Sequence, residues 1–117
     1  MIREAQLSDV VDFLSERGMN APDRIKSNCV IINELMMLAW FELTEQDCEV
    51  HICVKKRGLR HLGELISVGI AYLHHLGFSK MTTAIKSEYK ASTKLVHRLG
   101  FDFVGCYNEY NIYTRAI

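Results

Sequence analysis

The sequence predicts a single α/β domain of the α+β kind, in which a mixed sheet of about six strands carries helices on both faces. Two observations lead to this fold class. The period of the apolar residues changes from two to 3.6 and back, and one strand–helix–strand unit lies between runs of short strands. Such a unit implies a parallel pair with a right-handed crossover, whereas consecutive short strands pair antiparallel. A chain of 117 residues has room for one core, so one domain over 1–117 is expected.

One helix and three strands are expected in the first half of the chain. Apolar residues at 7, 10, 11, 13 and 14 predict an amphipathic helix over 8–17, with Ser8 as its N-cap and Gly18 as its stop. The apolar runs at 29–32 and 35–43 predict two strands. The alternating segment 49–54 predicts a third. Its apolar face consists of Val50, Ile52 and Val54, and its other face of Glu49, His51 and Cys53.

The second half alternates helices with strands. Apolar residues recur at helical spacing from 62 to 76, which predicts a long core helix ended by Gly77. The segment 80–85 predicts a strand, and apolar residues at 91, 95 and 99 predict a helix ended by Gly100. Strands over 101–107 and 110–114 form a closing hairpin around Asn108 and Glu109. The strands at 49–54 and 80–85 are therefore the expected parallel pair.

Composition excludes several classes of protein. Hydrophobic residues make up 49% and the formal net charge is zero, so the chain is not expected to be disordered. No apolar run approaches the roughly 20 residues that cross a bilayer, so no membrane contact is expected. The first ten residues lack the apolar core of a secretory signal, which favours a cytoplasmic location with four free thiols. No spacing of histidines or cysteines supports a metal site.

The neutral total conceals an asymmetry of charge. Residues 1–54 carry four basic and ten acidic side chains, and residues 55–117 carry ten basic and four acidic ones. Lys55, Lys56, Arg57 and Arg60 lie close together, which favours binding of an anion there. A nucleic-acid reader would be basic overall and interleave basic with aromatic residues, so a small phosphorylated ligand is expected and nucleic acid is not. A solvated charged loop is the alternative interpretation.

Three motifs together resemble the GNAT superfamily of acyl-CoA-dependent N-acetyltransferases. They are the strand CEVHICV with Glu49, the basic glycine turn KKRGLRHLG, and SEYKASTKLVHRLGFDFVG with its Leu-Gly-Phe ending. The resemblance covers 35–114 and implies acetyl-CoA as cosubstrate, an amine as acceptor, and a parallel strand pair that splays apart. Bacteriophage members with a similarly glycine-poor turn look most alike, which would place the protein in the host cytoplasm. A homodimer is left open.

The resemblance also implies where the cofactor binds. Arg57 and Gly58 fall where the family's Arg/Gln-x-x-Gly-x-Gly/Ala loop starts, although two larger residues replace small ones later in this turn. Backbone N–H groups at such a strand-to-helix turn suit a pyrophosphate. A backbone N–H near a bulge in the preceding strand polarises the thioester in the family. The implied cofactor residues are Ile52, Cys53, Val54, Arg57, Gly58, Leu59, Arg60, His61, Leu62 and Gly63.

Catalytic roles follow from the resemblance in the same way. The family's strand carboxylate often takes the amine proton through water, and that position is Glu49. The family's usual acid is a tyrosine in the last helix, where this chain has Val96. Two residues are candidates to act as the acid in place of that tyrosine. They are Tyr89, at a position where the family often has asparagine, and His97. A thiolate can leave without an acid, so the missing tyrosine does not abolish the chemistry.

Two further interpretations remain to be weighed. His51 and Cys53 share a strand face, but no orienting group or nucleophile turn accompanies them, so a Cys/His nucleophile is disfavoured against a hydrogen-bonded histidine and a small buried thiol. The function itself divides into two classes. One is an acetyl-CoA-dependent N-acetyltransferase that acts on a primary amine with Glu49 as general base. The other is a non-catalytic module of the same fold, such as a phage accessory or virion protein, that works through protein contacts.

Overall fold

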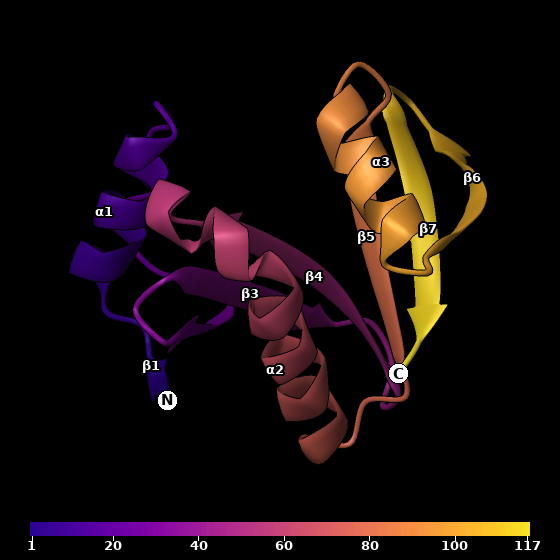
Figure 1. The fold of residues 1–117 in the computed structure, drawn as a ribbon. Helices are drawn as coiled ribbons and strands as arrows, with labels where there is room; N and C mark the ends of the chain where they lie inside the picture. Colours follow the sequence, from indigo (N-terminus) through magenta and orange to yellow (C-terminus); the bar gives the residue numbers. More distant parts are fainter.

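The computed structural model describes residues 1–117 and contains one seven-stranded mixed sheet (Figure 1). The strand order is β1-β2-β3-β4-β5-β7-β6. In chain order the elements are β1 (Ile2–Glu4), α1 (Leu7–Glu16), β2 (Asn28–Ile32), β3 (Met36–Glu42), β4 (Asp47–Val54), the 3₁₀ helix η1 (Lys56–His61), α2 (Leu62–His75), β5 (Lys80–Lys86), α3 (Lys90–Arg98), β6 (Asp102–Tyr107) and β7 (Tyr110–Ala116). The α/β class with helices on both faces is confirmed.

The expected number of about six strands is one too few, because β1 escapes sequence patterning. It has three residues, too few for an alternating pattern, and it exists through antiparallel pairing with β2, in which Ile2 lies opposite Ile32.

Helix α1 begins at Leu7, one residue before the predicted start at residue 8. Its N-cap is Gln6 and not Ser8, since the Asp9 carboxylate accepts the Gln6 backbone N–H at 2.8 Å.

The two central strands are parallel and splay apart, as expected. Pairing of β4 with β5 covers three positions and ends at Glu49↔Thr82. Each strand stays paired on its other side: β4 pairs with β3 as far as Val54, and β5 pairs with β7 as far as Lys86. The sheet therefore opens into a V beyond Glu49, and the two halves diverge in Figure 1.

Two clusters of buried side chains hold the helices on the sheet. The larger cluster lies between the sheet and α2 and α3, and includes Met36 and Leu65, both fully covered. The smaller cluster seats α1 on the opposite face through Phe13, Ile31 and Met37. The apolar face of 49–54 expected from alternation lies against the larger cluster through Val50 and Val54. None of the helices is both long and apolar enough to span a membrane.

Candidate functional site

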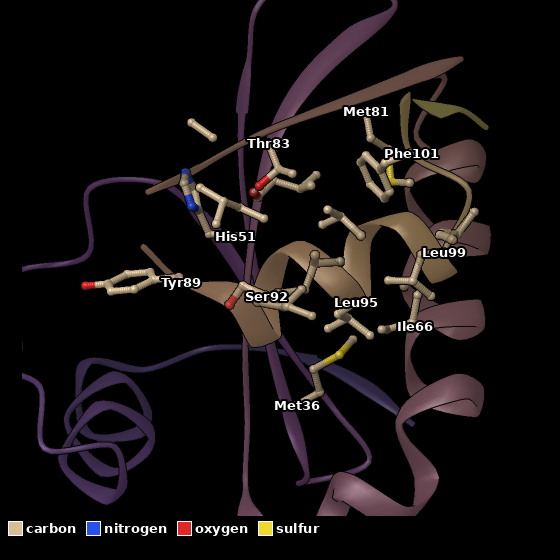
Figure 2. A pocket seen from close by; sticks show the side chains of 18 of the residues that line it. Met36, His51, Ile66, Met81, Thr83, Tyr89, Ser92, Leu95, Leu99 and Phe101 are labelled. Carbon is tan, nitrogen blue, oxygen red and sulfur yellow. Dashed lines mark hydrogen bonds between the residues drawn. The ribbon is translucent and has the colours of Figure 1, made fainter. Parts of the chain in front are cut away.

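A cleft of about 570 Å³ occupies the V between β4 and β5. Its lining is mostly apolar and comes from both strands and from α2 and α3 (Figure 2). Six of the lining residues carry polar side chains, namely His51, Thr83, Lys86, Tyr89, Ser92 and Tyr110. An apolar slot with few polar groups, at the divergence of parallel strands, is a characteristic place for a ligand.

Some backbone N–H and C=O groups of β4 have no strand partner and point into this V. In the antiparallel ladder with β3, hydrogen-bonded pairs alternate with non-bonded ones. Leu43 N–H donates to the Asp47 carbonyl at 2.9 Å and Lys55 N–H donates to the Leu35 carbonyl at 2.9 Å, so odd-numbered β4 residues bond to β3. The N–H groups of Ile52 and Val54 therefore face the side that β5 has left. Cys53 bonds to β3 instead, so its backbone is not available to a ligand.

The facing strand has the same pattern. Ser87 N–H donates to the Glu109 carbonyl at 3.1 Å, beside the ladder of β5 with β7, so odd-numbered β5 residues bond to β7. The backbone groups of Ala84 and the N–H of Lys86 consequently face the V, whereas the Lys86 carbonyl accepts the Tyr89 N–H at 2.9 Å. The base of the V is closed by Thr83, whose hydroxyl donates to the Val50 carbonyl at 3.1 Å.

The bulge expected near 52–54 is absent. Pairing of β3 with β4 keeps one register from Glu42↔Cys48 to Met36↔Val54. The open N–H groups therefore arise from the loss of β5 as a neighbour and need no extra residue in β4. The bulge expected from the family resemblance is therefore wrong, because divergence of β5 alone exposes the backbone of β4.

Glu49 and His51 form a pair on the α1 face of β4. Nε2 of His51 lies 2.8 Å from a carboxylate oxygen of Glu49, and both side chains are partly exposed. The imidazole also meets the ring of Phe41 edge-on, at 6.3 Å between centroids. His51 lines the cleft, whereas Glu49 does not. The histidine is thus hydrogen-bonded to a neighbour, as expected from the sequence in place of a Cys/His nucleophile.

Tyr89, Val96 and His97, the residues considered from the sequence for the role of an acid, lie in or beside α3. Tyr89 lies in the cleft wall at the N-cap of α3, and Figure 2 shows its hydroxyl pointing away from the other labelled side chains. Val96 is buried and lines the cleft without a polar group. The rings of His97 and Tyr113 meet edge to face at 5.5 Å between centroids, and His97 is not part of the lining. Tyr89 is therefore the better placed of the two candidate acids.

The turn before α2 differs from an open loop. Residues Lys56–His61 form a 3₁₀ helix that runs directly into α2. Gly58 is buried, and a Cβ there would lie 3.0 Å from Leu35 Cβ and 3.2 Å from Val54 Cγ1. The glycine is required for packing of η1 on the sheet. A Cβ on Gly63, by contrast, would meet nothing within 4 Å.

The first two residues of this turn, Lys55 and Lys56, contact α1. The ammonium of Lys55 is buried, pairs with Asp12 and lies 4.6 Å from the centroid of the Phe13 ring. The Lys56 backbone N–H donates to Glu16 at 3.1 Å. At the end of β4, the Arg17 guanidinium donates to the Val54 carbonyl at 2.8 Å. These contacts anchor α1 to the end of β4, a role that sequence patterning missed.

The remaining residues of the turn are more accessible. Arg57 donates to the Glu34 carbonyl at 3.3 Å, and Leu59 and Arg60 are exposed. His61 is the N-cap of α2, and Leu62 packs partly against the larger core cluster. The side chains of Arg60 and Lys56 are exposed and have no ion pair or hydrogen bond within the chain, so they are the basic side chains of this turn most available to an anion.

The Cys/His nucleophile is not supported by this geometry. Cys53 donates its S–H to the Phe13 carbonyl at 3.6 Å, on the α1 side of the sheet. Burial raises the pKa of its thiol, which disfavours the thiolate needed for attack. Cys53 is therefore a small buried thiol.

Solved acetyltransferase structures share this architecture over the whole chain. An acetyltransferase from Streptococcus agalactiae superposes with a TM-score of 0.71 at 13% identity, over 100% of this chain and 98% of that one. For the ribosomal-protein-S18-alanine N-acetyltransferase from Escherichia coli the TM-score is 0.69 at 14% identity, over 100% and 93%. A GNAT superfamily phosphinothricin acetyltransferase from Sinorhizobium meliloti, in complex with acetyl-CoA, gives 0.69 at 15% identity, over 100% and 88%. The chain has the GNAT fold.

At these identities the likeness concerns the fold. No protein-family model matches the sequence, and no curated protein matches it. Within the GNAT fold, Thr83 and Ser92 are cleft residues that sequence reasoning missed. Thr83 belongs to no motif, and Ser92 lies within the motif SEYKASTKLVHRLGFDFVG without a role assigned to it. Both reach the cleft only because β5 and α3 pack beside β4.

Proposed function

We propose that the protein is an acetyl-CoA-dependent N-acetyltransferase that moves an acetyl group to a primary amine, with residues 1–117 acting as one domain. The observation that carries the proposal is the cleft between β4 and β5, where backbone groups of Ile52 and Ala84 face an apolar slot. An extended amide-containing arm suits such a slot, because it can pair with an open strand edge. The acetyltransferases of the same fold support this choice.

The chemistry requires a proton acceptor for the amine and hydrogen-bond donors for the developing oxyanion. Glu49 is the proposed general base. The N–H groups of Ile52 and Val54 are the proposed donors to the thioester carbonyl. A thiol ionises near pH 8.5, so the CoA thiolate can leave unprotonated and acquire its proton from water or from Tyr89.

The proposed pyrophosphate site is the junction of η1 with α2. Arg60 and the backbone near Gly63 suit an anion there, since the side chain is free and no Cβ obstructs the approach to Gly63. Arg57, Leu59, His61 and Leu62 would flank it. Gly58 contributes indirectly, by seating the turn against Leu35. No metal takes part in this proposal.

The experiment has a binding step and a turnover step. Acetyl-CoA at 100 times its dissociation constant should stabilise the native state by about 2.7 kcal/mol, which a melting curve detects. Release of free thiol is then followed with spermidine, kanamycin and a peptide with a free amino terminus. Replacement Glu49→Gln should lower turnover by roughly 10² to 10⁴ while acetyl-CoA affinity stays within about twofold.

A second candidate function is a non-catalytic module of the same fold. Buried Val96 in the cleft favours it, because no side chain at that position can protonate a leaving thiolate. Binding of acetyl-CoA without thiol release to any amine would support this candidate. Thiol release that depends on Glu49 would exclude it.

A further inference from the structure

Glu49 and His51 of β4 each have one property that a general base needs, and neither has both. Glu49 carries the negative charge, but its side chain is not among those that line the cleft. His51 carries a titratable ring and does line the cleft. Figure 2 shows the His51 ring at the same end of the cleft as Thr83 and Tyr89. The carboxylate therefore reaches the cleft only through the imidazole.

The hydrogen bond between them determines which ring nitrogen is available. An ionised carboxylate only accepts, so Nε2 of His51 donates its proton to Glu49 across 2.8 Å. In a neutral imidazole the other nitrogen, Nδ1, then has a lone pair. The edge contact with Phe41 further restricts the ring. Glu49 thus selects the tautomer and the orientation of His51.

We propose that His51 is the catalytic residue that takes the proton from the acceptor amine, and that Glu49 is a positioning residue that holds and stabilises the imidazole. The inference rests on the proposed function and changes how Glu49 acts in it: the carboxylate works through a side chain and not through water. Two adjacent positions of one strand face, i and i+2, suffice to build the pair.

The proposed reaction balances as follows. Nδ1 of His51 takes one proton from the substrate ammonium, and the resulting imidazolium keeps its Nε2–H on Glu49. The amine nitrogen forms a C–N bond to the thioester carbonyl carbon, and the C–S bond breaks with its electron pair on sulfur. The second amine proton goes to the thiolate. The products are an N-acetylated amine, free CoA thiol and one proton that His51 returns to solvent.

Two other polar side chains of the cleft, Thr83 and Lys86, already have partners within the protein. The hydroxyl of Thr83 donates to the Val50 carbonyl. Lys86 lies 3.8 Å from Glu109, whose charge raises the lysine's pKa, so it remains a cation and cannot accept a proton. The Tyr89 hydroxyl points away from the other labelled side chains in Figure 2. His51 is the cleft residue with a free acceptor nitrogen and an anchored second nitrogen.

The test compares four variants in the thiol-release assay with spermidine, kanamycin and a free-amino-terminus peptide. His51→Gln should lower kcat by roughly 10² to 10⁴ with little change in KM for acetyl-CoA. Glu49→Gln should lower kcat less than His51→Gln. Because the two residues act as a unit, the double variant should be no slower than His51→Gln alone. His75→Gln, an exposed histidine at the end of α2, is the matched control and should retain parental kcat.

Chemical rescue separates positioning by Glu49 from a merely structural role. Added imidazole should restore part of the activity of His51→Ala, and the restored rate should fall at least tenfold when Glu49→Gln is also present. A His51→Gln variant at the parental rate, with Glu49→Gln strongly impaired, would overturn the relay and leave the proposed function intact. A parent protein that binds acetyl-CoA and releases no thiol would overturn both.

Discussion

The ammonium of Lys55 is buried against the ring of Phe13 and pairs with the carboxylate of Asp12. A residue that looks in sequence like part of a phosphate-binding turn is thus an anchor between α1 and the end of β4. The ion pair joins residues 43 positions apart in the chain. The Arg17 guanidinium at the C-cap of α1 also donates to the Val54 carbonyl, so two polar contacts hold α1 to the end of β4.

Removing the carboxylate should cost more than removing the ammonium. Asp12→Asn leaves a buried cation without its counter-charge and is expected to lower the free energy of unfolding by about 1–3 kcal/mol. Lys55→Met keeps the apolar stem over Phe13 and is expected to change it by less than about 1 kcal/mol. Urea titrations measure both, with Asp23→Asn, an exposed acid, as control. A larger loss in Lys55→Met would contradict the anchoring role.

The two glycines of the η1–α2 region should respond oppositely to the same substitution. Gly58→Ala forces a Cβ against Leu35 and Val54 and is expected to destabilise the protein by about 1–3 kcal/mol. Gly63→Ala places its Cβ in open space within α2 and is expected to stabilise it by about 0.4–1 kcal/mol. Thermal melts of the two variants provide the comparison. Equal effects would refute the packing role of Gly58.

Charge reversal at the turn should weaken binding of CoA. Arg60→Glu is expected to raise the Kd for CoA about tenfold at low ionic strength, and the ratio should shrink toward unity near 1 M salt. Arg57→Glu should have a smaller effect, because that guanidinium already contacts the Glu34 carbonyl. Arg24→Glu changes the net charge equally and serves as control. A tenfold effect that persists at high salt would indicate a structural cause instead.

Stability should fall in acid partly through Asp9. The Arg3 guanidinium, which hydrogen-bonds to this carboxyl at 2.8 and 2.9 Å, lowers the pKa of Asp9 from 3.8 to about 2. A carboxyl with a lowered folded-state pKa stabilises the native state above its unfolded pKa, and this contribution is lost as pH falls from about 4 through 2. Asp9→Asn should therefore lower the melting temperature at pH 7 and flatten its decline below pH 4. Asp23→Asn should do neither.

Local patterns in the sequence account for most of the fold. Alternation located β4, helical spacing located α2, and the glycines at 77 and 100 fall immediately after helices. Both have positive φ angles, 102° and 82°, which favour glycine at these stops. β1 was missed, since three residues carry no period and this strand depends on Ile32 for a partner.

The candidate site was likewise predicted only in part from the sequence. The sequence alone determined which residues stand on one face of β4, because a strand alternates strictly, and so Glu49 and His51 could be paired as neighbours on that face. Only the tertiary structure decided which of the two reaches the cleft, which lysine is buried and which glycine is packed. Those properties depend on where β5, α1 and η1 lie around β4, and such contacts between distant segments leave no periodic signal in the chain.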